Sequence, residues 1–566
     1  MEFSPKKMVN WYDPKQLAFT GMKTIISGIF GNFADKREIQ AALDKSEAAK
    51  FDYSNRDEIW IDYISDLGDG FNATYTMAHL LAQDELIVHS KAVKRGDILV
   101  MGGDQVYPTP ELKEYRNRLQ GPYHAAFPKV ENDENPPDLF AIPGNHDWYD
   151  GLTNFLKIFC QNRSLGNWRT KQRRSYFALK LPQNYWLIAL DIQLNSDIDY
   201  PQLQYFKEIA EYQIQEEDKI IIATAEPSWV YKSFDQKNSS HDRFEFFINN
   251  ILLGKNSNYY GGKNEKIQIS AILTGDLHHY ARYEEKDDQD RLRQLITAGG
   301  GGAFMHLTHN LKDNIKTRDG KEATLRAAFP SKGESKLLSL KNLLFPFYSY
   351  TMLFFFGIFH ALSTWVLHSH VENQNFLSEP ATSLISLLYN LPIFPGIVIL
   401  HLILFAGITL FTDTSSGAGK WNYFAGGLHG LFQVANFYVM TYLLSGTLVS
   451  LLTKAIFSYY IGMIIFGGIT SGIIFGIYLL LSVSFLNNHI TEGSSSFRHK
   501  GYKNFLRIHI SPKGVTIYPI GVKNVVKNWK KAADSTTPES PYTFKGSTVE
   551  YELIENPIHI SHEKAI

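Results

Sequence analysis

Five apolar runs in the first 300 residues end in side chains that can bind metal ions. The runs, each with the residues that follow, are IWIDYIS before Asp66-Leu67-Gly68, ILVMG before Gly103-Asp104-Gln105-Val106-Tyr107, LFAIP before Gly144-Asn145-His146-Asp147, KIIIATA before Glu226-Pro227, and QISAILT before Gly275-Asp276-Leu277-His278-His279-Tyr280. Carboxylate, amide and phenol oxygens and imidazole nitrogens suit Mn, Mg, Fe or Zn. The pattern therefore predicts a metal centre.

Short strands must position these side chains. The apolar runs alternate with helical patterns, for example over residues 72–84 and 241–253. Strands that alternate with helices predict a layered α/β domain, in which ligand sites gather beyond the carboxyl ends of the strands. Each motif alone is common, but four of them in this order after predicted strands indicate one shared site.

The ordered motifs D-x-G, G-D-x-x-Y, G-N-H-D and G-x-x-H-x-Y-x-R, over residues 55–305, resemble the calcineurin-like metallophosphoesterases. The match is most similar to the purple-acid-phosphatase branch, because Asp66 and Gly68 fit D-x-G where other branches have D-x-H. In the last motif, Asp276 stands where the family has the first His of G-H-x-H. The resemblance implies a β-sandwich flanked by helices and two metal ions.

The resemblance also implies a role for each motif residue. Asp104 would bridge the two metals. The first metal would take three further ligands, Asp66, Tyr107 and His278. The second metal would take two, Asn145 and Asp276.

A departure from the family lies before Pro227. The family has a His two residues before this proline, whereas this chain has Ala225, followed by Glu226. Either Glu226 substitutes for the His, or the second metal has three protein ligands and is weak, exchangeable or supplied with the substrate. Carboxylate in place of imidazole favours Mn or Mg over Zn at this position. Of Mn, Fe, Mg and Zn, we expect Mn or Fe.

Such a centre predicts hydrolysis of a phosphate ester. Two cations bridged by a carboxylate lower the pKa of a hydroxide held between them and clamp the phosphoryl oxygens. We expect His146 to face the substrate and either to donate a proton to the leaving oxygen or to bind a phosphoryl oxygen, with Asp147 orienting its ring. His279 and Arg282 are further candidates for substrate contact, although His279 has the alternative of packing inside the domain.

Composition excludes several classes of protein. The chain has 566 residues and a net charge of −1, which excludes a globally basic nucleic-acid binder, so we expect no nucleic-acid partner. Its single cysteine, Cys160, excludes an intramolecular disulfide framework and a cysteine-based zinc site. The run TAGGGGAF at 297–304 has no P-loop Lys after it and predicts a tight loop near the site.

The second half of the chain predicts a membrane region. Four runs contain no Lys, Arg, Asp or Glu, at 342–371, 380–412, 421–453 and 455–491. Each exceeds the ~20 residues that a helix needs to cross a bilayer. Pro392 and Pro395 predict that the second spanning helix begins near residue 395. We therefore expect an all-α bundle of four transmembrane helices within 342–491.

Flanking charges set the expected topology. Lys332, Lys336 and Lys341 precede the first run, and Arg498 and Lys500 follow the last. An even number of spans and this bias place both soluble ends in the cytoplasm. The N-terminus has no apolar signal-peptide core, and residues 18–34 predict a helix that lies either on the membrane or on the domain.

The expected domains are thus an N-terminal helical or interfacial segment at 1–50, a metallophosphoesterase domain at 51–335, the membrane region at 342–491 and a soluble tail at 492–566. The tail contains two predicted strands, at 505–510 and 515–522, joined by a turn at 512–514. Its basic residues at 498–507 and 523–531 either contact anionic lipid headgroups or form a solvated face.

Two functions follow from this sequence. The first is a membrane-anchored phosphoesterase that hydrolyses a phosphomonoester or phosphodiester, whose substrate is a lipid-linked phosphate or a soluble nucleotide. The second is a non-catalytic membrane protein whose degenerate phosphoesterase domain senses a phosphorylated ligand. Ala225 and Asp276 motivate the second function, while Asp66, Asp104 and His146 favour the first.

Overall fold

The computed structural model forms two compact units. The described residues are 2–30, 37, 51–130, 133, 135–192, 198–255, 267–287, 289–317, 321–370, 395–414, 419–451, 456–532, 541–546 and 548–560. The first unit consists of the described residues within Met1–Val9, Thr20–Lys332 and His499–Ile566, and the second of those within Asn10–Phe19 and Gly333–Arg498. The two units are described separately below.

The first sheet of the first unit has a parallel centre. Strands β2, β5 and β6 pair in parallel, and their carboxyl ends therefore lie along one edge. The strands of this sheet in spatial order are β21 (Glu552–Leu553), β18 (Gly514–Val522), β17 (Lys503–Ser511), β2 (Ile59–Ile64), β5 (Ile98–Met101), β6 (Asp138–Ala141), β8 (Trp168–Thr170) and β7 (Ser164–Leu165), and β22 (Ile558–Ile560) pairs with β18.

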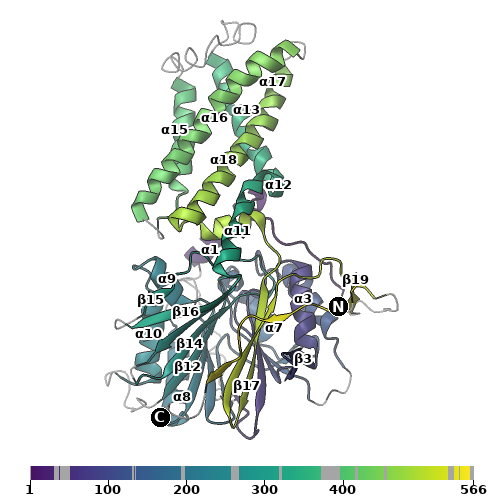
Figure 1. Ribbon diagram of the computed structural model, residues 1–566, viewed down its shortest axis with the longest axis vertical. Helices are drawn as coiled ribbons and strands as arrows, with labels where there is room; N and C mark the ends of the chain where they lie inside the picture. The colour runs from purple at the N-terminus through teal and green to yellow at the C-terminus, as the bar shows by residue number, and fades with distance from the viewer. Residues whose placement is uncertain are drawn as a thin grey trace. The chain divides into compact units, whose positions relative to one another are not determined.

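The second sheet is also mixed, with parallel pairing from β10 through β11 and β12 to β14. Its strands in spatial order are β1 (Phe51–Asp52), β9 (Phe177–Leu181), β10 (Tyr185–Ala189), β11 (Lys219–Ala223), β12 (Gln268–Thr274), β14 (Leu292–Ala298), β13 (Tyr280–Lys286), β16 (Glu322–Phe329) and β15 (Asn314–Lys316). Figure 1 shows the strands of both sheets side by side in this unit.

Helices cover the sheets through apolar faces. Phe206 and Ile209 of α8 (Tyr200–Tyr212) share one hydrophobic core with Ile188 and Ile222 of the second sheet. Helix α10 (Ser240–Phe246) and the π-helix η2 (Phe247–Leu252) belong to the same core, and α3 (Phe71–Ala82) packs against β17 of the first sheet. The expectation of an α/β domain with layered sheets is confirmed.

The predicted elements of this unit are present. All five apolar runs form strands, namely β2, β5, β6, β11 and β12. The helical patterns at 72–84 and 241–253 become α3 and the α10–η2 pair. Helix α1 (Pro14–Phe30) accounts for the N-terminal helix as far as residue 30, while residues 31–34 lie outside the described residues.

The C-terminal strands complete the first sheet. Strand β17 pairs with β18 as the predicted hairpin and, on its other side, pairs antiparallel with β2. Its basic residues therefore do not form the lipid-facing or solvated surface that the sequence predicts. Lys503 and Arg507 are fully buried, because β17 lies inside the sheet instead of at its edge.

A buried ion pair joins β17 to β2. Arg507 Nε lies 2.8 Å from Asp62 Oδ1, and Arg507 also donates to the carbonyl oxygen of Val93 at 2.9 Å. The second oxygen of Asp62 accepts the backbone N–H of Gly96 at 3.0 Å. Both charged groups are thus hydrogen-bonded as well as paired, which is the condition for their burial to be tolerated.

The second unit is helical. Its long helices are α13 (Tyr350–His370), α15 (Pro395–Leu410), α16 (Asn422–Leu451) and a continuous segment of α17 (Ile456–Gly462), η7 (Met463–Gly467), α18 (Gly468–Leu481) and η8 (Ser482–Leu486). Helices α13, α16 and α18 run alongside one another in Figure 1, and α15 packs on α16. Helix α15 begins at Pro395, as the prolines predict, and the earlier part of that run lies outside the described residues.

Two helical segments, Tyr350–Leu367 and Phe457–Leu486, are long and apolar enough to cross a membrane. This finding rests on length and composition within the described residues. The helices of this unit carry large apolar side chains on their exposed surface, including Phe354, Ile403, Phe424 and Phe457.

We expect the Arg507–Asp62 pair to be essential to the first unit. Replacing Arg507 with Met leaves Asp62 buried without its partner, at a cost of about 3–5 kcal/mol. The double variant Arg507→Met, Asp62→Asn removes both charges, so it should recover part of the loss. Thermal unfolding of the purified chain tests this prediction, and equal melting temperatures for the single variant and the unsubstituted chain would contradict it.

Candidate active site

Three aspartates follow strands in a strained backbone conformation. Asp66, Asp104 and Asp276 come after β2, β5 and β12, with φ angles of 59°, 50° and 66°. Non-glycine residues rarely adopt this left-handed region, and such strain is typical of functional sites. The backbone N–H of Asp276 donates to Asp66 Oδ2 at 2.9 Å, so the strand ends of the two sheets meet here.

Glycines leave the space that these carboxylates occupy. A Cβ atom on Gly144 would lie 2.1 Å from Asp104 Oδ1, and one on Gly299 would lie 2.6 Å from Asp66 Oδ2. Both positions therefore exclude any side chain. The predicted tight loop at 299–302 does pass beside the site.

The hydroxyl of Tyr107 lies between three polar groups. Its oxygen is 3.0 Å from Asp66 Oδ1, from Asp104 Oδ2 and from His278 Nε2. The other nitrogen of His278, Nδ1, is 2.8 Å from the carbonyl oxygen of Phe304. A carbonyl oxygen only accepts, so Nδ1 carries the proton and Nε2 presents a lone pair to the site.

This arrangement needs a cation. Burial raises the pKa of Asp66, and the charges of Asp104 and Asp276 raise it further; burial and the Asp276 charge raise the pKa of Asp104 to about 8. Burial lowers the pKa of His278, which keeps this residue neutral. One hydroxyl proton cannot satisfy two carboxylates and an imidazole lone pair, whereas a metal ion satisfies all of them.

The donor set fits the two metal ions that the motifs imply. The side-chain oxygen of Asn145 is buried and has no hydrogen-bond partner among the described residues, as expected of an oxygen that would bind a cation. Within the described part of the chain, no three His, Cys, Asp or Glu side chains are already arranged around one point. The cluster depends instead on Tyr107 and Asn145, which are outside those four residue types.

His146 and Asp147 lie beside this cluster, and their side chains form hydrogen bonds with different groups. The backbone N–H of His146 donates to Asp104 Oδ1 at 2.9 Å, and its Nδ1 lies 2.9 Å from the carbonyl oxygen of Pro108. Nδ1 therefore carries a proton, and burial lowers the pKa of the ring to about 4. The expectation that Asp147 orients this ring is wrong, because the Pro108 carbonyl does so.

Asp147 instead fixes the loop that carries Asn145. Its Oδ2 accepts the backbone N–H groups of Gly144 at 2.9 Å and Gln105 at 3.1 Å, and its Oδ1 accepts the hydroxyl of Tyr115 at 2.5 Å. Burial and the Asp104 charge raise the pKa of Asp147 to about 8. Asp147 thus connects the turns after β5 and β6.

Ala225 and Glu226 lie on the side of the cluster formed by Asp276. A Cβ atom on Gly103 would lie 3.0 Å from the Cβ of Ala225, so position 225 faces the turn that carries Asp104. Burial and the Asp276 charge raise the pKa of Glu226 to about 7. Asp276 also accepts a hydrogen bond from the hydroxyl of Tyr231. Glu226 therefore lies within electrostatic range of the expected second metal position.

The two further substrate candidates lie elsewhere. Arg282 forms a bidentate ion pair with Glu555, at 2.8 and 2.6 Å, and donates to Gln294, so its guanidinium faces these groups instead of the aspartates. His279 is buried directly before β13, where burial lowers its pKa to about 4. Its neighbour His278 is the one that the structure brings to Tyr107.

Three groups near the site were not expected from the sequence, namely Tyr115 on Asp147, Tyr231 on Asp276 and Lys503 of β17. His306, which the sequence places just beyond the glycine run as a weak candidate for substrate contact, stacks on His278 with the ring centroids 4.2 Å apart. The tyrosines carry no motif signal. Lys503 does carry a sequence signal. It is a charged residue beside the apolar run FLRIHI, and such a residue needs a polar partner once the strand is buried.

Comparison with known proteins identifies the domain. Residues 59–280 match the sequence model of the family described as calcineurin-like phosphoesterase. A search of curated proteins gave no match. This part of the chain is a calcineurin-like phosphoesterase domain, and the protein is a hydrolase of phosphate esters.

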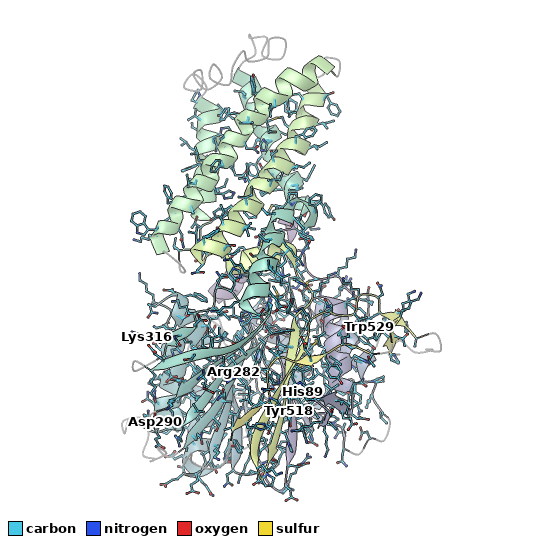
Figure 2. All side chains as sticks on the ribbon, viewed as in Figure 1. His89, Arg282, Asp290, Lys316, Tyr518 and Trp529 are labelled. Carbon is cyan, nitrogen blue, oxygen red and sulfur yellow. The ribbon has the colours of Figure 1, made fainter. Side chains whose placement is uncertain are left out.

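We expect Asp104→Asn to abolish tight metal binding, since Asp104 contacts both the Tyr107 hydroxyl and the His146 backbone. Loss of even an outer partner weakens metal binding about 10- to 100-fold, so a direct ligand should cost at least as much. Mn²⁺ binding measured by electron paramagnetic resonance tests this. Asp290→Asn is the matched control, because Asp290 also has a left-handed φ of 58° but a side chain that is 87% exposed (Figure 2). Equal affinities for the two variants would contradict the prediction.

Metal binding should also depend on pH. With the pKa of Asp104 raised to about 8, its carboxylate is protonated at neutral pH in the metal-free protein and must lose that proton to bind a cation. The Mn²⁺ affinity should therefore rise with pH and level off above about 8. Calorimetric titration in buffers of different ionisation enthalpy counts the released protons, and binding without proton release is the opposing result.

Proposed function

We propose that this protein is a membrane-anchored, metal-dependent phosphoesterase that acts on a phosphomonoester or phosphodiester carried by a lipid. The observation that carries the catalytic part is the Tyr107 hydroxyl at 3.0 Å from two buried carboxylates and one imidazole lone pair. A domain without metal chemistry would not keep so many unsatisfied acceptors buried together.

The residues divide into two ligand groups in this proposal. Asp66, Tyr107 and His278 would hold the first metal, Asn145 and Asp276 would hold the second, and Asp104 would serve both, with Glu226 as a further carboxylate near Asp276. Bound ions would supply a deprotonated water at neutral pH and positive charge at the phosphoryl oxygens. Because the second group contains only oxygen donors, it favours Mn or Mg over Zn, while the Tyr107 phenol suits Fe in the first.

His146 has the geometry of a proton donor to the leaving group. The Pro108 carbonyl fixes the proton on Nδ1, so Nε2 is the ring nitrogen that would exchange a proton with the substrate. The backbone N–H of the same residue binds Asp104, which ties the position of the ring to the metal bridge. A bound dianionic ester beside the ring would raise its pKa from about 4 toward the range in which it donates.

The surface and interior of the helical unit support membrane anchoring. Its exposed faces carry Phe and Ile, while its buried positions hold hydrogen-bonded polar groups: His401 Nδ1 lies 2.8 Å from the Tyr438 hydroxyl, and His360 Nε2 lies 2.9 Å from Ser471 Oγ. Apolar residues outside and polar residues inside are typical of a helix bundle surrounded by lipid. The basic flanks of the apolar runs favour a cytoplasmic site for both soluble ends.

Hydrolysis assays on the detergent-purified full chain test the proposal. The chain would be loaded in turn with Mn²⁺, Fe²⁺, Mg²⁺ or Zn²⁺ and given aryl phosphate monoesters and diesters. It would then be given phosphatidic acid in mixed micelles and a soluble nucleotide. We expect turnover that depends on Mn²⁺ or Fe²⁺, is lost in Asp104→Asn, and is faster on the lipid phosphate than on the nucleotide.

Two other results of these hydrolysis assays would contradict different parts of the proposal. Faster turnover of the nucleotide would overturn the lipid substrate but keep the enzyme. A folded chain that binds metal and yet hydrolyses none of these esters would contradict the proposed catalysis and favour a ligand-sensing domain.

Replacing His146 with Gln tests its role as a proton donor. Loss of a general acid costs roughly 10²–10⁴-fold when the leaving group needs a proton, and little when it does not. The variant should therefore lose most activity on an alkyl phosphate while keeping most on a nitrophenyl phosphate. An equal loss on both esters would assign His146 to binding or structure instead.

A further inference from the structure

Lys503 is a buried cation beside the candidate active site. It lies at the start of β17, is fully buried, and its ammonium group donates to the carbonyl oxygen of Ala303. The carboxylates that act on it electrostatically are Asp69 and Asp66. A buried ammonium bonded to a neutral carbonyl costs stability compared with an apolar residue of the same size. Stability alone therefore does not explain this lysine.

The acceptor of Lys503 belongs to the glycine loop, which we define as residues 299–306. Other backbone groups of this loop form hydrogen bonds with the residues at the end of β2. The backbone N–H of Ala303 donates to the carbonyl oxygen of Asp66 at 3.0 Å, and that of Gly301 donates to the carbonyl of Ser65 at 2.8 Å. The loop thus holds Asp66 in its left-handed conformation.

The same loop also sets the ring of His278. The Phe304 carbonyl accepts the Nδ1 proton at 2.8 Å, the backbone N–H of His306 donates to the His278 carbonyl at 3.2 Å, and the His306 ring stacks on the His278 ring. Any shift of the loop would therefore turn the lone pair of His278 Nε2 away from Tyr107.

Residues of the C-terminal segment fix the loop at three points. Besides the Lys503 contact, the backbone N–H of Asn504 donates to the Gly300 carbonyl at 3.2 Å, and the His499 carbonyl accepts the N–H of Met305 at 2.9 Å. Strand β17 is itself anchored by its pairing with β2, the strand that leads into Asp66. Loop, strand and metal ligands thus form one closed set of contacts.

We propose that Lys503, supported by Asn504, is a positioning residue that holds the glycine loop and through it aligns Asp66 and His278 for metal binding. This inference rests on the proposed function, because it takes Asp66 and His278 as metal ligands. It assigns a role in the active site to the C-terminal segment, about 200 residues along the chain from the loop that it holds.

The variant Lys503→Met tests this role, because Met fills a similar volume without a donor or a charge. We expect its Mn²⁺ affinity to fall about 10- to 100-fold and its kcat on an aryl phosphate to fall with it, while KM stays unchanged. Its melting temperature should stay the same or rise, since a buried charge is replaced by an apolar group. Lys513→Met, at the exposed turn of the same hairpin, is the matched control.

The readouts separate positioning from a structural role. A merely structural lysine would lower the melting temperature and leave the Mn²⁺ affinity of the folded fraction unchanged, and that result would overturn the inference. If Lys503→Met does not fold, Lys503→Arg decides, because Arg keeps the charge but presents a longer, planar donor to Ala303. Weaker Mn²⁺ binding by folded Lys503→Arg supports the inference, and unchanged binding overturns it.

Failure of this inference can be told apart from failure of the proposed function. Hydrolysis by the unsubstituted chain with equal Mn²⁺ affinity in Lys503→Met would remove the positioning role and keep the enzyme. Mn²⁺ binding that depends on Lys503, without hydrolysis of any ester, would keep the positioning role and remove the catalysis. An unsubstituted chain that binds no Mn²⁺ would overturn both.

Discussion

The crowding of the Asp66 and Asp104 carboxylates around the hydroxyl of Tyr107, with the charge of Asp276 acting on both, is the constraint on which the rest of the site depends. Burial raises the pKa of Asp104, and repulsion by the nearby Asp276 charge raises it further, to about 8. Such a cluster is tolerated because a cation can bind between its members. The left-handed aspartates, the glycines that leave them room and the Phe304 carbonyl that orients His278 all serve to keep this unfavourable arrangement in place.

The C-terminal segment makes this arrangement rigid. A site at the ends of β2, β5 and β12 needs fixed strands, and β2 would be an edge strand without β17. Exposed edges pair readily with other chains and fray, which would loosen Asp66. Pairing with β17 and the buried Arg507–Asp62 contact remove that edge. Residues that follow the helical unit in sequence therefore complete the sheet that carries the proposed ligands Asp66 and Asp104, so that neither half of the first unit forms the candidate site alone.

The sequence predicted the strands and the polar residues that gather at their ends, because strand ends, glycines and motif residues are local features. Each of β2, β5, β6, β11 and β12 is a short apolar run bounded by turn residues, and the candidate ligands follow directly. What the sequence could not predict depends on long-range pairing. Nothing local indicates that β17 lies beside β2, that Pro108 instead of Asp147 orients His146, or that Tyr231 reaches Asp276.

The departures from the family pattern fall together on one side of the cluster, and this has a consequence for metal choice. Asp276 and Glu226 offer oxygen atoms where imidazole nitrogens are expected, beside Asn145, whose amide oxygen the family pattern includes, while His278 remains on the opposite side with Asp66 and Tyr107. Oxygen donors bind Mn and Mg ions well but discriminate poorly against other hard cations, and they hold them less tightly than imidazole holds Zn. The two positions should therefore differ in affinity, with a firmly held ion beside Tyr107 and an exchangeable one beside Asp276. An exchangeable second ion would make activity depend on the available metal concentration. The affinity that Asp276, Glu226 and Asn145 give the second position would then set the fraction of molecules that hold both ions.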